Sequence, residues 1–97
     1  MIKIKVIKEE FIKEVIISGH ALYADYGKDI VCASVSSIVI TTINAIEMFD
    51  NHNIIVNEEA LSIKVLLSNE IIDKLLNNML NMLSELANDY PKNIKFI

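Results

Sequence analysis

Two side chains of this sequence are suited to act as a nucleophile and its base. The chain contains one cysteine, Cys32, and His20 precedes it in the same segment. A thiol and an imidazole within hydrogen-bond reach share a proton, which gives a thiolate for attack on a carbonyl carbon and an imidazolium that later protonates a leaving amine. The pair predicts covalent catalysis, with Cys32 as nucleophile and His20 as base. The competing interpretations are a small buried cysteine and a turn histidine without a chemical role.

The residues around Cys32 favour the catalytic interpretation. Asp29 stands at the expected N-cap of a helix, where its carboxylate accepts a hydrogen bond from the backbone amide of Val31 or of Cys32. Cys32 then falls in the first helical turn, where unpaired amides and the positive end of the helix dipole stabilise a thiolate. The same backbone amides at the helix start are candidate donors to the oxyanion of an acyl-transfer intermediate.

Two further side chains are candidate supporting residues of this site. Ser36 lies one helical turn after Cys32 on nearly the same face, so its hydroxyl is a candidate to bond the site. Asp29 is a candidate to orient His20 in addition to capping the helix. Capping alone explains Asp29, and helix packing alone explains Ser36, so both simpler interpretations stay open.

Both glycines of the chain, Gly19 and Gly27, bracket the connection that carries His20. Backbone freedom is thus concentrated at the two ends of one loop, which is the arrangement of a movable flap. Two ordinary turn glycines are the alternative. Because the loop begins beside His20, we predict that Gly19 and Gly27 are flap hinges.

The elements that position these residues follow from hydrophobic periodicity. Residues 2–6 alternate isoleucine or valine with lysine, which predicts a half-buried strand, and a second β-rich run extends through Ile17. A long amphipathic helix is predicted from Asp29 to Phe49. Its expected buried face consists of Val31, Val35, Ile38, Val39, Thr42, Ile46 and Phe49.

The second half of the chain has a similar layout. Two β-branched runs, 54–56 and 61–67, predict a second hairpin. Ser68 or Asn69 is the expected cap of a second helix that ends near residue 88, and residues 94–97 are a candidate last strand. The order ββαββα(β) predicts an α+β fold, with a mostly antiparallel sheet and two helices packed on it.

Length, composition and charge limit the function further. The 97 residues contain no Pro/Gly/Ser-rich stretch that would divide them, so we expect a single domain over 1–97. The hydrophobic content of 53% is high for so small a domain and favours a homodimer. The net charge of -4 argues against direct nucleic-acid binding, because neutralising phosphates requires clustered cations. A basic protein or peptide is therefore the expected partner.

The sequence also predicts a location and the absence of cofactors. A single cysteine cannot form an internal disulfide, and the N-terminus lacks the apolar core of a signal peptide, so we expect a reduced thiol in the cytoplasm. No run approaches the roughly 18 uninterrupted apolar residues of a membrane span, so no membrane partner is expected. Cys32, His20 and Asp29 lack the spacing of a recognised metal site, and we expect neither a metal nor another cofactor.

The positions that carry chemistry form one pattern, which reads Gly19-His20-Ala21, Gly27, Asp29-Ile30-Val31-Cys32-Ala33 and Ser36. Together these residues resemble the signature of Prp, a family of bacterial ribosomal-processing cysteine proteases, and the ββα start and the second helix extend the likeness over nearly the whole chain. The resemblance implies a homodimeric endopeptidase that removes the N-terminal extension of large-subunit ribosomal protein twenty-seven during ribosome maturation.

The resemblance also implies roles for individual residues. The residues matching Cys32 and His20 act as nucleophile and base, those matching Asp29 and Ser36 support the site, and the loop between them moves over the substrate. Leu22 departs from the pattern, at a place where family members often have glycine, which predicts a stiffer flap. The acidic balance of the chain suits a basic ribosomal substrate. A non-catalytic dimeric module that binds a basic ribosomal protein is the alternative function.

Overall fold

The structure is a computed structural model that describes residues 1–25, 27–50, 52–57, 59 and 61–97. Five strands and two helices follow one another in the predicted order, which confirms the ββαββα(β) arrangement. They are β1 (Ile2–Lys8), β2 (Ile12–Ser18), α1 (Ile30–Phe49), β3 (Ile54–Asn57), β4 (Ser62–Val65), α2 (Glu70–Asp89) and β5 (Ile94–Phe96).

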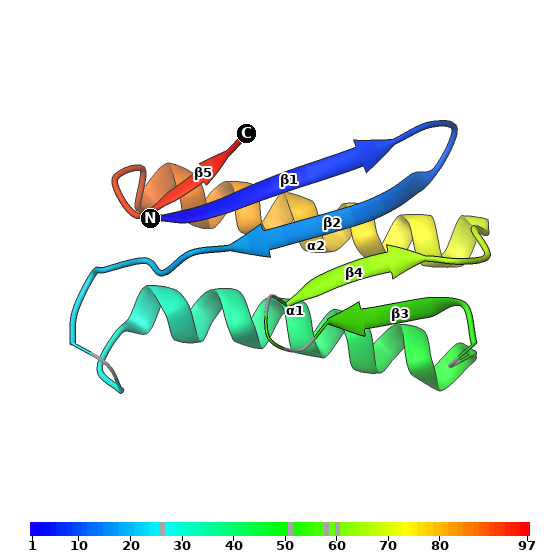
Figure 1. Cartoon of the computed structure of the whole chain (residues 1–97), viewed down its shortest axis with the longest axis horizontal. Coiled ribbons are helices and arrows are strands. Elements are labelled where there is room, and N and C mark those ends of the chain that lie inside the picture. The colour runs from blue at the N-terminus through cyan, green and yellow to red at the C-terminus, as the bar shows by residue number, and fades with distance from the viewer. Residues whose placement is uncertain (26, 51, 58, 60) are drawn as a thin grey trace.

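The strands form one sheet in the order β3-β4-β2-β1-β5. Every neighbouring pair is antiparallel except β1 and β5, which run parallel, so the sheet is mostly antiparallel as predicted. Along β1, Ile2 and Ile4 are buried whereas Lys3 and Lys5 are exposed, as expected for a strand with one solvated face. Both helices pack on the same face of the sheet (Figure 1).

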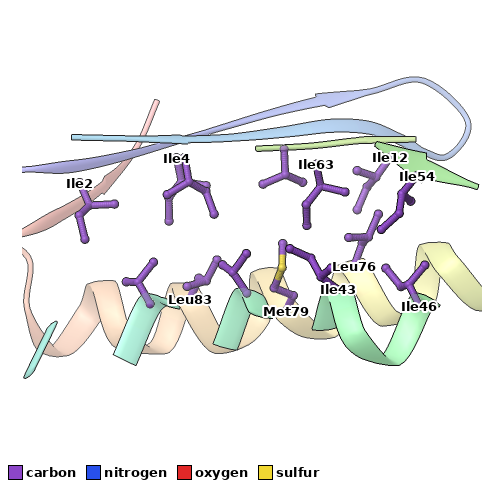
Figure 2. Packing of buried hydrophobic residues seen from close by; sticks show 14 of the residues in the cluster. Ile2, Ile4, Ile12, Ile43, Ile46, Ile54, Ile63, Leu76, Met79 and Leu83 are labelled. Carbon is purple, nitrogen blue, oxygen red and sulfur yellow. The ribbon is translucent and has the colours of Figure 1, made fainter. Parts of the chain in front are cut away.

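The hydrophobic core fills the space between the sheet and the helices (Figure 2). Asn69 is the N-cap of α2, since its side chain accepts a hydrogen bond from the Ile72 amide at 2.9 Å. The buried residues of α2 follow the predicted helical spacing and are Ile72, Leu76, Met79 and Leu83. All elements share this core, although the expectation of a single domain over 1–97 stays a prediction.

Five predicted residues of the buried face of α1 are buried, Ile38 is only partly buried, and Phe49 is wrong; the buried five are Val31, Val35, Val39, Thr42 and Ile46. Phe49 is 67% exposed, whereas Ile43, which the pattern did not include, is 7% exposed and belongs to the core. Phe49 is the last residue of α1, so no further turn of helix continues the buried face around it. Near a helix end, periodicity alone is therefore a poor guide to burial.

α1 is also long and apolar enough to cross a membrane by length and composition, with a mean hydropathy of 1.7 and 33% of its apolar stretch buried. Core helices of soluble proteins meet the same criterion, and the inner side of α1 packs in the core shared with the sheet. The absence of a membrane partner stays a prediction from the sequence.

Candidate active site

The loop between β2 and α1, residues 19–29, carries His20 and leads directly to the helical turn that carries Cys32. It is called the active-site loop below. It lies at the end of the molecule where α2 turns into β5 and where the N-terminus is found (Figure 1). Segments far apart in the sequence therefore meet around it.

The two glycines of the active-site loop have different surroundings. Gly19 has φ +83°, and a Cβ atom built on it would overlap the carbonyl oxygen of Met1. Gly27 has φ +82°, but a Cβ atom there would meet nothing within 4 Å. Both positions need the left-handed backbone region that glycine adopts readily. Their role as hinges stays a prediction. Gly19 packs against Met1 and Ile2 at the start of β1, whereas the space beside Gly27 is empty among the described residues.

Asp29 uses both carboxylate oxygens to join the loop to the helix. One oxygen accepts from the backbone amides of Val31 and Cys32, at 3.0 Å each, which confirms the predicted N-cap. The other accepts from the amides of Tyr23 at 2.9 Å and Ala24 at 3.4 Å. The capping residue is thus also a tether for the middle of the loop.

The pKa of the Asp29 carboxyl is held below its usual value, chiefly by the hydrogen bond from the Cys32 amide. Burial opposes this effect, and the amides of Tyr23, Ala24 and Val31 act with the Cys32 amide. Asp29 is therefore ionised near neutral pH. Within the described parts of the chain it makes no hydrogen bond to His20, so a role in orienting His20 receives no support from this geometry.

Cys32 is half-buried against the core, and its Sγ accepts a hydrogen bond from the backbone N–H of Ala21 at 3.3 Å. The amides of Val31 and Cys32 are already bonded to Asp29, so they are not free to serve as the oxyanion donors expected from the sequence. The donor that reaches the sulfur comes instead from the active-site loop. A thiolate at Cys32 gains from such a donor, because hydrogen bonds to a charged acceptor stabilise it.

His20 is exposed, two residues beyond the end of β2. No hydrogen bond between its imidazole and Cys32 is present in the described portion of the structure. Two pockets, of about 510 and 580 Å³, nevertheless share His20 and Cys32 in their walls. The structure thus brings the two predicted residues to one site without closing a hydrogen bond, a common state for a site without substrate.

The two pockets lie on either side of the pair. The first, here called the sheet-side pocket, is lined by Ile2, Ile17, Ser18, Gly19, His20, Cys32, Val35, Ser36, Glu59 and Leu61. The second, the loop-side pocket, is lined by His20, Leu22, Ala24, Gly27, Asp29, Cys32 and Ala33. Such depressions on both sides of a nucleophile suit an extended peptide that passes across it. Ser36 lines the first pocket with Cys32, as its helical spacing predicted.

Metal binding receives no support from the arrangement of the described side chains, which contain no group of 3 or more His, Cys, Asp or Glu placed to hold an ion. The expectation of no metal stays a prediction from the sequence.

Comparison with known proteins identifies the family of this chain. Residues 1–95 match the family model described as cysteine protease Prp. The chain belongs to the Prp family. It is therefore a cysteine protease, and membership in this family argues against the non-catalytic module. The matched region contains the whole active-site loop and every predicted site residue.

Individual Prp proteins agree with this assignment. The ribosomal processing cysteine protease Prp of Mycoplasma pneumoniae is 37% identical over 83 residues, which cover 81% of this chain and 80% of that protein. The essential ribosomal processing protease Prp from S. aureus, in complex with a covalently linked product peptide, is 27% identical with a TM-score of 0.86. That match covers 99% of this chain and 97% of the other. The same S. aureus protein with a substrate peptide is 26% identical with a TM-score of 0.81, over 100% of this chain and 98% of the other.

The backbone at Leu22 adopts a conformation that favours glycine. Leu22 has φ +56°, in the left-handed region, and its side chain is 78% exposed. A non-glycine residue costs about 1–2 kcal/mol there, because its Cβ approaches the following carbonyl oxygen. The conformation persists because neighbouring contacts determine it. The sequence showed the departure at Leu22, but only the structure shows this strain.

We expect Asp29→Asn to release the active-site loop while keeping the helix cap. An asparagine oxygen still accepts from Val31 and Cys32, but its NH₂ group cannot accept from the amides of Tyr23 and Ala24. Hydrogen exchange of those two amides should accelerate about tenfold, as expected for a lost hydrogen bond of typical strength. Asp29→Ala should destabilise the chain further, because it also removes the helix cap.

Lowering the pH should release the active-site loop of the unaltered chain, as Asp29→Asn does. Since the folded pKa of Asp29 is depressed, its stabilisation is fully present above the unfolded value of about 3.9 and is lost as the pH falls through the lower folded value.

Asp25→Asn is the matched control for Asp29→Asn, because it removes the same charge from the same loop while the hydrogen bonds from Tyr23 and Ala24 to Asp29 stay. Equal exchange rates in Asp29→Asn and Asp25→Asn would show that the tether does not order the loop.

Proposed function

We propose that this chain is an endopeptidase that removes the N-terminal extension of large-subunit ribosomal protein twenty-seven, with Cys32 as nucleophile and His20 as base. One observation carries the residue assignment. The chain has a single cysteine, and this cysteine lies beside an exposed histidine between two pockets. A cysteine protease needs a thiol, and Cys32 is the one that the sequence provides.

The geometry supports a covalent route. The Cys32 thiolate attacks the carbonyl carbon of the scissile bond, and a C–S bond forms as the carbonyl electron pair moves to oxygen. Collapse of this intermediate breaks the C–N bond, and the His20 imidazolium gives its proton to the leaving amine. Water that is deprotonated by His20 then attacks the thioacyl carbon, which releases the carboxylate product and returns the thiol. Ser36 supports the site as part of the wall of the sheet-side pocket, and Asp29 supports it by holding the active-site loop.

Two kinds of observation support the substrate. The relatives from Mycoplasma pneumoniae and S. aureus are named ribosomal processing proteases, and the S. aureus protein holds substrate and covalently linked product peptides. The net charge of -4 favours the approach of a basic ribosomal protein. Glu59 adds a carboxylate to the sheet-side pocket, where it suits a cationic substrate residue.

The homodimer and the cytoplasmic location are part of the same proposal. Several large apolar side chains remain exposed, among them Ile40, Met48 and Phe49 on α1, which suits a chain that buries further surface on association. Sedimentation of the purified chain measures the association directly, and a monomer at micromolar concentration would contradict the homodimer.

The substrate is tested with a peptide that spans the junction between the extension and the mature N-terminus of the host's ribosomal protein twenty-seven. We expect a single cut at the junction, identified by the masses of the two products. Enzyme that has been alkylated beforehand at its one cysteine is the control and should leave the peptide intact. If the host protein lacks an extension, or the junction stays uncut while other ribosomal peptides are cleaved, the substrate is wrong but the protease assignment stands.

A further inference from the structure

The connection between α2 and β5, residues 90–93, contacts the active-site loop from the other end of the sequence; we call it the α2–β5 corner. The side-chain amide of Asn93 donates a hydrogen bond to the carbonyl oxygen of Ala21 at 2.9 Å. The ring of Tyr90 lies edge-on against the ring of Tyr23, with centroids 5.4 Å apart and planes at 86°. Figure 1 shows the corner and the loop at the same end of the molecule.

Asn93 is a fixed point of the fold. Its backbone carbonyl accepts a hydrogen bond from the amide of Ile2 at 2.8 Å, and its own amide donates to the carbonyl of Tyr90 at 3.0 Å. The residue is half-buried, and the next residue, Ile94, begins β5 and is buried in the core. The position of the Asn93 backbone is therefore set by the start of β1 and the end of α2, independently of the loop.

Ala21 links this fixed point to the reactive sulfur. Its side chain is 1% exposed, its carbonyl accepts from Asn93, and its N–H donates to Cys32 Sγ at 3.3 Å. A buried methyl group alone fixes the position of the residue but leaves rotation about its backbone bonds. The hydrogen bond from Asn93 restrains that rotation and so keeps the N–H directed at the sulfur.

This restraint is opposed by strain in the next residue. Leu22, with φ +56°, relaxes if the backbone on either side is free to turn. Asp29 holds the loop after Leu22, through the amides of Tyr23 and Ala24, and Asn93 holds it before Leu22. Loss of the Asn93 contact therefore lets the backbone turn at Ala21, where the donor to the sulfur is located.

We propose that Asn93 is a positioning residue of the protease, which holds the Ala21 carbonyl and thereby keeps the Ala21 N–H on the Cys32 sulfur. It touches neither substrate nor sulfur and acts through Ala21. The inference rests on Cys32 as the nucleophile of the proposed function. A donor directed at the sulfur stabilises the negative charge that the sulfur carries when it attacks, and this favours its reaction.

The deciding measurement is the rate at which iodoacetamide alkylates Cys32 near neutral pH, followed by intact mass. Because the chain has a single cysteine, the mass change reports this site alone. We expect Asn93→Ala and Asn93→Leu, which is similar in shape but has neither the donor nor a charge, to slow alkylation by about threefold to tenfold, the range of one neutral hydrogen bond. With a cleavable peptide, kcat should fall by a similar factor with little change in KM. Asn88→Ala is the matched control, since this asparagine is exposed and its side chain makes no hydrogen bond within the described residues.

Each outcome decides the proposal. Slower alkylation in folded Asn93 variants, with Asn88→Ala at the wild-type rate, supports it. Unchanged alkylation with a lowered melting temperature would show that Asn93 only stabilises the fold. Faster alkylation would show that the loop limits access of the reagent to Cys32. Either result overturns the proposal. Should Asn93→Ala fail to fold, Asn93→Leu decides. Alkylation needs no substrate, so this result is independent of the cleavage site, whereas cleavage that persists in Cys32→Ala would refute the proposed nucleophile itself.

Discussion

Cys32→Ala should lower peptide cleavage by at least about 10⁴-fold, the scale on which removal of a catalytic nucleophile acts. Cys32 is half-buried beside the core, and alanine keeps the Cβ while removing the sulfur that the Ala21 amide contacts. The variant should therefore fold, and circular dichroism checks this. Junction-peptide cleavage followed by mass spectrometry measures the loss. Trimming by purified Cys32→Ala at the wild-type rate would show that another group is the nucleophile.

The two histidines provide a matched pair for the same assay. His20→Ala should reduce cleavage by about 10²- to 10⁴-fold, the usual contribution of a general acid and base. His52→Ala should have no effect, because His52 lies after α1, is 83% exposed at its side chain and contacts only the Asp50 carboxylate, at 3.3 Å, among the described residues. Equal activity of the two variants would remove His20 from the mechanism.

The parts of the site that the sequence predicted are those determined by local rules. Asp29 and Cys32 are separated by less than one helical turn, so the cap, the helix start and the position of the thiol follow from neighbouring residues. Alternation in β1 and helical spacing in α2 likewise predicted those two elements, because each pattern depends on a short window. The sequence predicted that His20 follows the second strand, because this depends on neighbouring residues. It did not predict how close the imidazole lies to Cys32.

The parts that were missed depend on contacts across the sequence. Asn93 lies in an ordinary turn before a short strand, and nothing in its neighbourhood indicates that its side chain reaches Ala21. Asp29 was a candidate to orient His20 in addition to capping the helix, yet its second oxygen binds the loop at Tyr23 and Ala24. That binding also changed the chemistry, because the helix-start amides expected to hold an oxyanion are already occupied. Leu22 predicted a stiffer loop, and the structure adds that its backbone is strained there, at φ +56°.

Gly19→Ala should destabilise the chain by about 2–4 kcal/mol, the sum of a left-handed backbone cost and an overlap that the surroundings cannot relieve. The added Cβ would meet the carbonyl oxygen of Met1, which belongs to the backbone and cannot move aside as a flexible side chain does. Met1 leads into Ile2, whose amide is bonded to the carbonyl of Asn93, so displacement would spread to the α2–β5 corner. Chemical denaturation measures the loss of stability.

Gly27→Ala isolates the steric part of this effect. The two glycines have nearly the same backbone angle, φ +83° and +82°, so the left-handed cost and the reduced entropy of the unfolded chain are nearly equal in both variants. Only Gly19 faces an overlap, and Gly27→Ala should therefore cost only about 1 kcal/mol. If the two variants lose equal stability, Gly19 is not confined by β1 and is free to act as a hinge like Gly27. If Gly19→Ala loses much more, movement of the loop has to come from its Gly27 end, because the end at Gly19 is held by the first strand.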